Sequence, residues 1–163
     1  MRVGDNPACH LTYCTNIHPG ETWPEIRDNL RRYLPAIKKE VAPTERFGVG
    51  LRLSANAARA LEAEAALGEL RDILDAHDLY VFTINGFPYG PFHGQRVKEE
   101  VYQPDWMTEE RLVYTNLLAD LLVDILPGDT ALEGSVSTVP GTFKPLAESP
   151  SAAHRMAEMM VRH

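Results

Sequence analysis

Strand-like and helix-like patterns alternate four times along this chain of 163 residues, and this order constrains the fold more than any other feature. Each strand is expected from a short apolar or alternating stretch between turn residues. The order βαβαβαβα places parallel strands side by side and joins them by right-handed crossovers through the helices. The expected strands cover residues 10–18, 47–54, 80–84 and 132–139.

The first two helices are expected from their capping signals. Thr22-Trp-Pro-Glu25 has the spacing of a capping box with an early proline, and Pro43 ends the helix that follows. Ser54 is expected to cap a long alanine-rich helix over residues 55–76. The first helix places its apolar residues on one face: Ile26, Leu30, Tyr33, Leu34, Ile37 and Val41.

The third and fourth helices are expected on the same grounds. Thr108 caps the third helix, and Pro127-Gly128 stops it. Ser149-Pro150 opens the fourth by a cap followed by proline. The apolar positions of the third helix follow helical spacing: Tyr114, Leu118, Leu121, Leu122 and Ile125.

Two architectures fit four parallel units, and both make one domain over residues 1–163. A closed (β/α)8 barrel needs eight strands and about 250 residues, so the chain would be the N-terminal (βα)4 half of a TIM barrel whose second half lies elsewhere. The alternative is a complete, small, open α/β sheet. Either form leaves unpaired edge strands and exposed apolar surface, so we expect self-association or a missing C-terminal half.

Composition excludes several classes of function. The net charge is −7 with no basic stripe, which argues against nucleic-acid binding. No apolar run approaches the roughly 20 residues of a membrane span, and no secretory signal is visible. Cys9 and Cys14 lie on or beside one expected strand, where a disulfide is awkward, so a reducing, cytoplasmic location is expected.

The loop after the third strand is the most informative segment for function. It carries the amide of Asn85, the aromatic rings of Phe87, Tyr89 and Phe92, and the imidazole of His93. Loops that follow parallel strands are where α/β proteins build ligand sites. Polar groups framed by aromatic walls suit a small hydroxylated metabolite.

Side chains at the carboxyl ends of barrel strands converge on one pocket, and this rule selects further residues. The substrate-binding candidates from the other three strands are Asn16, Arg52 and Ser137, and His18 joins His93 as a candidate for proton transfer. His10 and His18 are separated by about 26 Å in an extended strand. His10 is therefore expected to serve structure at the opposite end.

Each candidate also has a structural interpretation. Asn85 can be a turn residue before a glycine, and His93 a loop histidine bonded to the main chain. Arg52 can be paired with an interior carboxylate instead of a ligand. Lys98 and Tyr102 lie four residues apart and can cover the pocket, or they can be a solvated lysine and a packing ring.

Four segments resemble one known family. HLTYCTNIHPGE (10–21), GLRLS (50–54), TINGFPYGPFHG (83–94) and VKEEVYQPDW (97–106) resemble the metabolite-traffic protein EboE family, a branch of the xylose-isomerase-like TIM barrels. Members of this family are longer than this chain, which favours the half-barrel interpretation. The resemblance implies handling or export of a small metabolite alongside a prenyltransferase-like partner.

The same resemblance implies what chemistry to look for. Xylose-isomerase-like enzymes hold a divalent metal with Glu, Asp and His residues of later strands, so the ligands would lie mostly outside this chain. An enzyme would perform metal-assisted isomerisation or epimerisation of a hydroxylated carbonyl compound, with Asn85 and Arg52 orienting it. The alternative is a non-catalytic metabolite carrier or scaffold. The class also contains abasic-site nucleases, which the missing basic surface disfavours.

Overall fold

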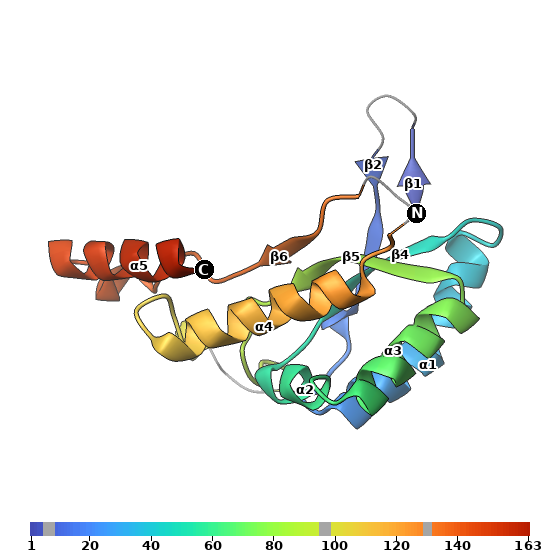
Figure 1. Ribbon diagram of the computed structural model, residues 1–163, viewed down its shortest axis with the longest axis horizontal. Coiled ribbons are helices and arrows are strands. Elements are labelled where there is room, and N and C mark those ends of the chain that lie inside the picture. The colour runs from blue at the N-terminus through green and yellow to red at the C-terminus, as the bar shows by residue number, and fades with distance from the viewer. Residues whose placement is uncertain (5–8, 95–98, 129–131) are drawn as a thin grey trace.

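A parallel sheet of four strands forms the centre of the computed structural model, which describes residues 1–4, 9–94, 99–128 and 132–163. Each strand is hydrogen-bonded to the next one along the chain (Figure 1). The chain is therefore an α/β protein with a parallel sheet and helices, as the alternating pattern predicts, and this is consistent with a (βα)4 unit. The strands are β3 (Thr12–Cys14), β4 (Phe47–Arg52), β5 (Leu79–Asn85) and β6 (Ser135–Ser137).

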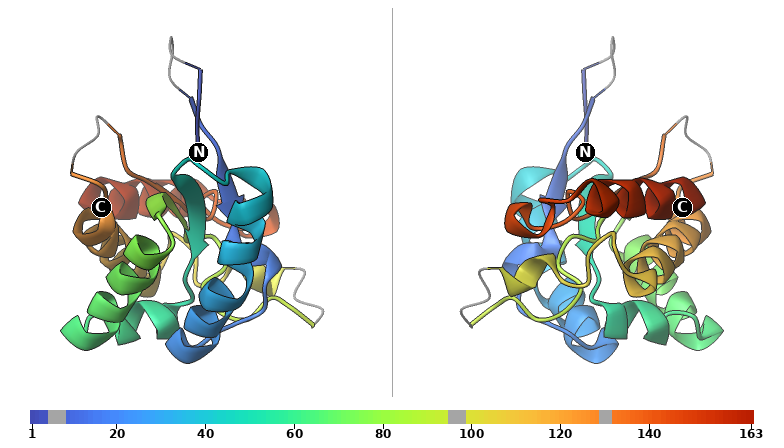
Figure 2. Two further views of the ribbon diagram at one scale, coloured as in Figure 1. Left: turned by 90° about the vertical axis from the view of Figure 1, so that its right-hand side faces the viewer. Right: turned by 90° about the vertical axis from the view of Figure 1, so that its left-hand side faces the viewer.

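The first strand is shorter than predicted. Of residues 10–18, His10 belongs to β2 (Cys9–His10), which pairs antiparallel with β1 (Arg2–Val3), and Thr15–Ile17 forms the 3₁₀ helix η1. The Met1 amino group donates to Leu11 O at 2.7 Å, and the Leu11 N–H donates to Met1 O at 2.8 Å. The pairing with β4 therefore begins only at Thr12, and Leu11 is exposed. The hairpin of β1 and β2 projects from the body in Figures 1 and 2.

The last strand is also shorter, since only Ser135–Ser137 of the predicted residues 132–139 pair with β5. The residues after Ser137 bond to Trp106 and not to β5. Its indole N–H donates to Thr138 Oγ1 at 3.1 Å, and its main-chain N–H donates to Gly141 O at 3.0 Å. Val139 is buried against Trp106 as a result.

Helix α1 (Trp23–Val41) begins and ends where its signals predict. The Thr22 N–H donates to the Glu25 carboxylate at 2.9 Å. This is the hydrogen bond that the glutamate of a capping box makes. Of the predicted apolar face, Ile26, Leu30 and Leu34 are buried and Tyr33 and Ile37 are half-buried. The prediction is wrong for Val41, which is 54% exposed because the helix ends there beyond the core.

The single helix predicted over residues 55–76 is wrong, because two helices occupy it. Ser54 caps α2 (Ala55–Ala60), accepting the Ala57 N–H at 3.1 Å, and α3 (Glu64–Ala76) follows after a break. Alanine favours helix throughout, but α2 packs against α4 and α1 whereas α3 packs against β5. Leu61, at the break, is fully buried.

Helices α4 (Glu109–Ile125) and α5 (Pro150–Arg162) start where predicted. Ser149 caps α5 by accepting the Ala152 N–H at 3.2 Å. Thr108 precedes α4, but its hydroxyl donates to Asp105 O at 2.9 Å. The predicted core positions of α4 are all buried: Tyr114, Leu118, Leu121, Leu122 and Ile125. Two further 3₁₀ helices are η2 (Glu100–Tyr102) and η3 (Lys144–Leu146).

The two faces of the sheet differ in character. Val49 and Leu51 of β4, with Val81 and Ile84 of β5, share one core with α1, α3 and α4. The opposite face, here called the inner face, carries the stacked rings of Tyr80 and Phe82 near the start of β5. Farther along, Cys14, Gly50, Thr83 and Ser135 stand in register across the four strands, so small side chains occupy that part of the face. Cys14, Ser135 and Ser137 on this face are exposed.

Among the described residues, we find no helix with the length and apolar character needed to span a lipid bilayer.

Candidate functional site

Three of the predicted site residues form one row across the sheet, here called the rim row. Arg52 lies opposite Asn85, and Asn85 lies opposite Ser137, at the carboxyl ends of β4, β5 and β6. The Ser137 hydroxyl donates to Asn85 Oδ1 at 3.2 Å. Because side-chain direction alternates along a strand, the rim row continues the inner face. The fold thus brings together residues that lie far apart in the sequence.

Asn85 serves the turn and faces the inner side at once. Its Oδ1 accepts the Phe87 N–H at 3.1 Å, which is the turn role expected for an asparagine before Gly86. Its Nδ2 group makes no hydrogen bond within the part of the chain that the structure describes. Two amide donors therefore remain that a ligand hydroxyl could accept.

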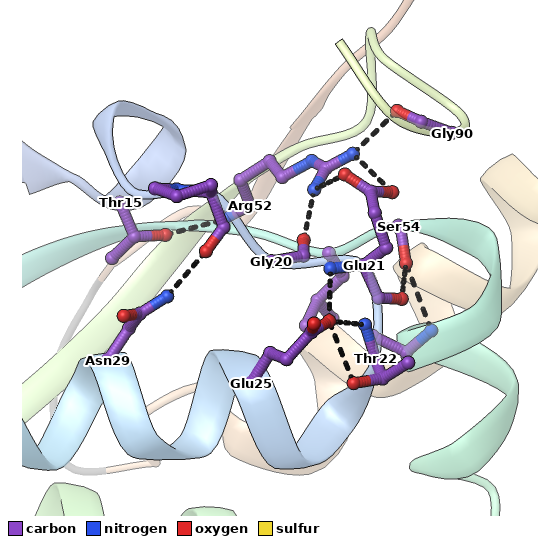
Figure 3. A network of polar contacts seen from close by, with 12 residues as sticks. Thr15, Gly20, Glu21, Thr22, Glu25, Asn29, Arg52, Ser54 and Gly90 are labelled. Carbon is purple, nitrogen blue, oxygen red and sulfur yellow. Dashed lines mark hydrogen bonds and ion pairs between the residues drawn. The ribbon is translucent and has the colours of Figure 1, made fainter. Parts of the chain in front are cut away.

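Arg52 is paired with a carboxylate, which is the structural interpretation of this residue. Its side chain is 2% exposed and forms a two-pronged ion pair with Glu21, at 2.9 Å to Oε1 and 3.2 Å to Oε2 (Figure 3). It also donates to Gly20 O at 2.6 Å and to Gly90 O at 2.8 Å. A guanidinium buried this deeply needs such compensation. Arg52 thereby joins the loop before α1 to the loop after β5.

The same loop before α1 is fixed by three further bonds (Figure 3). The Arg52 main-chain N–H donates to Thr15 Oγ1 at 2.9 Å, and the Ser54 hydroxyl donates to Glu21 O at 2.5 Å. Asn29 Nδ2 of α1 donates to Pro19 O at 2.7 Å. Both α1 and the end of β4 therefore bond to this part of the rim.

The two histidine candidates lie near each other at the rim. The His18 ring stacks on Tyr33 with centroids 4.1 Å apart, and its Nε2 is hydrogen-bonded to the Tyr13 hydroxyl at 3.0 Å. Burial, and then the electrostatic effect of the nearby His93 ring, lower the pKa of His18 below its usual value. His18 is therefore neutral at neutral pH.

Two buried nitrogen atoms at the rim have no partner among the described residues, Arg52 Nε and His93 Nδ1. The Phe92 ring lies between their side chains, with its centroid 5.0 Å from Arg52 Cζ and 4.0 Å from the His93 ring. Arg52 and His18 also line a small cavity of about 10 Å³, the size of one water molecule.

The aromatic candidates divide into two groups. Phe87 and Tyr102 meet edge to face at 5.5 Å, so they line one part of the loop region. The Tyr89 hydroxyl accepts an N–H of Arg59 at 2.7 Å, and its ring packs on Tyr114 at 5.0 Å. Tyr89 also lines a surface cavity of about 240 Å³ between residues 88–91 and 100–103.

Two other candidates complete the set. Asn16 lies half-buried in η1, directly after β3 and one residue beyond Thr15. Lys98 lies outside the described residues. His10 lies at the other end of the sheet, as predicted, where its Nδ1 is hydrogen-bonded to the Tyr80 hydroxyl at 2.8 Å. The described residues contain no group of three or more His, Cys, Asp or Glu side chains arranged to hold a metal ion.

Two residues that hold the rim loops were missed by sequence reasoning. Arg111 is fully buried and donates to three main-chain oxygens, of Gly86 at 2.7 Å, Pro104 at 2.7 Å and Phe87 at 3.2 Å. Burial lowers the pKa of Arg111 below its usual value. The signal was present, because Arg111 occupies the buried stripe of α4 together with residues 115 and 118.

Asp105 was missed for a different reason, since its partners are set by the tertiary fold. It is 1% exposed, and its carboxylate accepts the Met107 N–H at 3.0 Å, Gln103 Nε2 at 2.9 Å and the Thr142 hydroxyl. These bonds tie the loop before α4 to the segment after β6. Nothing in the local sequence distinguishes such a carboxylate from an exposed one.

Comparison of this chain with family models, curated proteins and solved structures gave no match.

Proposed function

We propose that this chain binds a small hydroxylated metabolite at the carboxyl rim of its sheet. The observation that carries the proposal is the rim row, in which Arg52, Asn85 and Ser137 stand side by side on adjacent strands. Parallel α/β proteins place their ligands outside the carboxyl ends of the strands, where loops of different strands meet. Asn85 and Ser137 offer an amide and a hydroxyl, which suit the hydroxyl groups of a sugar or polyol.

The proposal includes the half-barrel architecture of the xylose-isomerase-like family. It is supported by the placement of α1, α3 and α4 against one face and of small, polar side chains toward the carboxyl ends of the strands on the other. In a (β/α)8 barrel the helices form the outer ring and the other face of the sheet turns inward. The four units described here would then form half of that ring.

The charge balance of the rim favours a neutral ligand over an anionic one. The Arg52 guanidinium is already neutralised by Glu21, so it would position the rim loops and have little charge to offer a phosphate or carboxylate. Asn85 and Ser137 are uncharged. A polyol or a neutral sugar is therefore the ligand class we propose, and no nucleic acid.

If the protein is an enzyme, His93 is the better placed of the two histidines for proton transfer. His18 has its Nε2 bonded to Tyr13, whereas His93 Nδ1 has no partner among the described residues. A divalent metal, held mostly by residues of the completing half, would polarise the carbonyl of a hydroxylated carbonyl substrate during isomerisation or epimerisation.

The second candidate function is a non-catalytic metabolite carrier or scaffold. It is favoured because two ionisable side chains of the rim already have partners: Arg52 forms an ion pair with Glu21, and His18 is hydrogen-bonded to Tyr13. A carrier needs only the uncharged donors of the rim row. We place either function in the cytoplasm, since Cys9 and Cys14, both in the described part of the chain, form no disulfide bond.

Ligand binding by the rim row can be tested by titrating the protein with a panel of polyols, pentoses, hexoses and their phosphates, followed by NMR chemical shifts. Asn85→Ala should weaken binding of the selected ligand by about tenfold, the worth of one or two hydrogen bonds. Asn56→Ala, at an exposed position of α2, is the matched control and should bind normally.

The same titration separates the alternatives. Shifts confined to residues far from β4, β5 and β6, or equal affinities for Asn85→Ala and the parent protein, would show that the rim row is not the site. Preference for sugar phosphates over the neutral sugars would contradict the role assigned to the Arg52–Glu21 pair. Conversion of the bound sugar to its isomer, followed in the same spectra, would favour the enzyme over the carrier.

A further inference from the structure

A cavity of about 220 Å³ lies at the opposite end of the sheet from the rim row, here called the amino-end cavity. Tyr80 in its wall and Asn85 of the rim row both belong to β5, and the five residues between their positions span about 17 Å of strand. The two places are therefore too far apart to share one small ligand. The cavity is lined by residues of β1, β2 and β5 and of the segments before β4 and β6: Arg2, His10, Glu45, Arg46, Tyr80 and Leu132.

Aromatic rings form a fixed group at this cavity. Tyr80 is 5% exposed, and its ring stacks with that of Phe82 at a centroid distance of 5.9 Å. The ring of His10, which comes from the hairpin that projects in Figure 1, meets both of them edge to face at 5.8 and 5.6 Å. A hydrogen bond of 2.8 Å between His10 Nδ1 and the Tyr80 hydroxyl joins two of the rings. Aromatic walls of this kind favour a flat, apolar ring in a ligand.

The lining of the amino-end cavity has an excess of positive charge. Among its described residues, Arg2 and Arg46 are cationic and Glu45 is the single anionic one, whereas the whole chain has a net charge of −7. Outside the lining, Asp78 contacts Arg46 at 3.6 Å, but it is also paired with Lys38 at 3.4 Å. The excess of positive charge therefore persists when these two neighbours are counted.

Arg46 and His10 show how this charge is arranged. Arg46 Cζ lies 5.5 Å from the centroid of the Tyr80 ring, and the guanidinium donates to Leu79 O at 3.4 Å. The Arg46 side chain is 45% exposed, so solutes can reach it. The pKa of His10 is lowered, first by burial and then by positive charges that include Arg2. His10 is therefore neutral at neutral pH, and the positive charge beside the rings comes from the arginines.

We propose that the amino-end cavity binds a small aromatic monoanion of the aryl carboxylate class, with its ring against Tyr80 and His10 and its carboxylate toward Arg46 and Arg2. The volume is below the roughly 300–1,000 Å³ of pockets for drug-sized ligands, so it admits about one ring. Guanidinium groups match a carboxylate in both shape and charge. Glu45 would repel a second negative charge, which disfavours a phosphate. This site is independent of the rim row, for which we propose a neutral ligand.

Benzoate is a suitable probe of this site. Benzamide has the same shape without the charge, and cyclohexanecarboxylate has the charge without the aromatic ring. In titrations at neutral pH followed by NMR chemical shifts, benzoate should bind saturably and at least about fivefold more tightly than either of them. Its shifts should centre on Arg46 and residues 79–82. Equal affinity for benzamide, tighter binding of inorganic phosphate, or shifts centred on the rim row would overturn the proposal.

Variants of the two arginines test the role of their charge. Arg46→Gln should weaken benzoate binding by about tenfold and leave benzamide binding unchanged. Arg32→Gln is the matched control, because Arg32 makes the same kind of contact on α1, with its Cζ 5.1 Å from the centroid of the Tyr33 ring. This control should bind benzoate normally. Arg2→Gln, at an exposed position of β1, should weaken benzoate binding by about threefold and leave the melting temperature unchanged.

The outcomes separate this site from the rim. Unchanged benzoate affinity in both Arg46→Gln and Arg2→Gln would overturn the proposal. If Arg46→Gln does not fold, Arg2→Gln decides alone. Asn85→Ala should bind benzoate as the parent protein does, so that a failure at the amino-end cavity leaves the rim proposal standing, and a failure at the rim leaves this one.

Discussion

Removal of the Glu21 carboxylate tests how the rim loops are held. Glu21→Ala leaves the Arg52 guanidinium, 2% exposed, with Gly20 O and Gly90 O as its remaining acceptors in the described structure. Breaking a fully buried ion pair costs about 3–5 kcal/mol, whereas an exposed pair is worth about 0–1 kcal/mol. Because the Glu21 side chain is 25% exposed, we expect the free energy of unfolding to fall by about 2 kcal/mol.

Urea denaturation at neutral pH measures this change, and a double-mutant cycle assigns it to the pair. Arg52→Met in the Glu21→Ala background should cost much less than Arg52→Met in the parent protein, with a coupling energy of about 1 kcal/mol or more. Glu62→Ala, at an exposed position after α2, is the matched control. A loss for Glu21→Ala within about 0.5 kcal/mol of this control, or additive single changes, would refute the reasoning.

Three further predictions concern the buried polar groups. Tyr114→Phe should lower the free energy of unfolding by about 1–2 kcal/mol in urea, because the Tyr114 hydroxyl, whose pKa burial raises to about 12, donates to Leu53 O at 2.5 Å. Arg111→Met should lower it by about 3 kcal/mol or more, since three loop carbonyls lose their donor, and a loss under about 1 kcal/mol would contradict this role. The pKa of His18 is lowered in the folded state, so the unfolded state binds this proton more readily and stability should fall as pH drops below about 6.5. His18→Gln should flatten that part of the stability curve, and an unchanged slope would assign it to other groups.

Where the sequence predicted structure well, the controlling interactions are local. The starts of α1, α2 and α5 depend on a cap residue and the first turn of the helix, within four residues of each other. The buried stripe of α4 depends on helical spacing, which the sequence displays directly. The order of strands in the sheet follows from the alternation of elements.

Where the sequence failed, contacts between distant segments decide. The break between α2 and α3 contains neither glycine nor proline, and the helices on its two sides pack against different neighbours, α2 against α4 and α3 against β5. The ends of β3 and β6 are set by Met1 and Trp106, which bond to segments 10 and 32 residues away. Helix and strand propensities depend on the local sequence, so they do not predict such distant partners.

The candidate site shows the same division. That Arg52, Asn85 and Ser137 would lie at one rim follows from the parallel order, because each ends its strand. That Glu21 is the partner of Arg52 does not follow, since several carboxylates precede β4 in the sequence. The sequence left a carboxylate partner open as one of two interpretations, and the fold supplies Glu21 at 2.9 Å.

Two buried arginines together hold the loop that follows β5. Arg52 and Arg111 each donate to main-chain oxygens of the segment that follows β5, at Gly90 for the first and at Gly86 and Phe87 for the second. Loop carbonyls have no ladder partner, so a buried loop needs such donors. With both arginines fixed by burial, the loop that carries Tyr89 and His93 would lose little conformational entropy if it binds the proposed ligand. The hydrogen bonds of a neutral sugar or polyol would then not also have to order the loop.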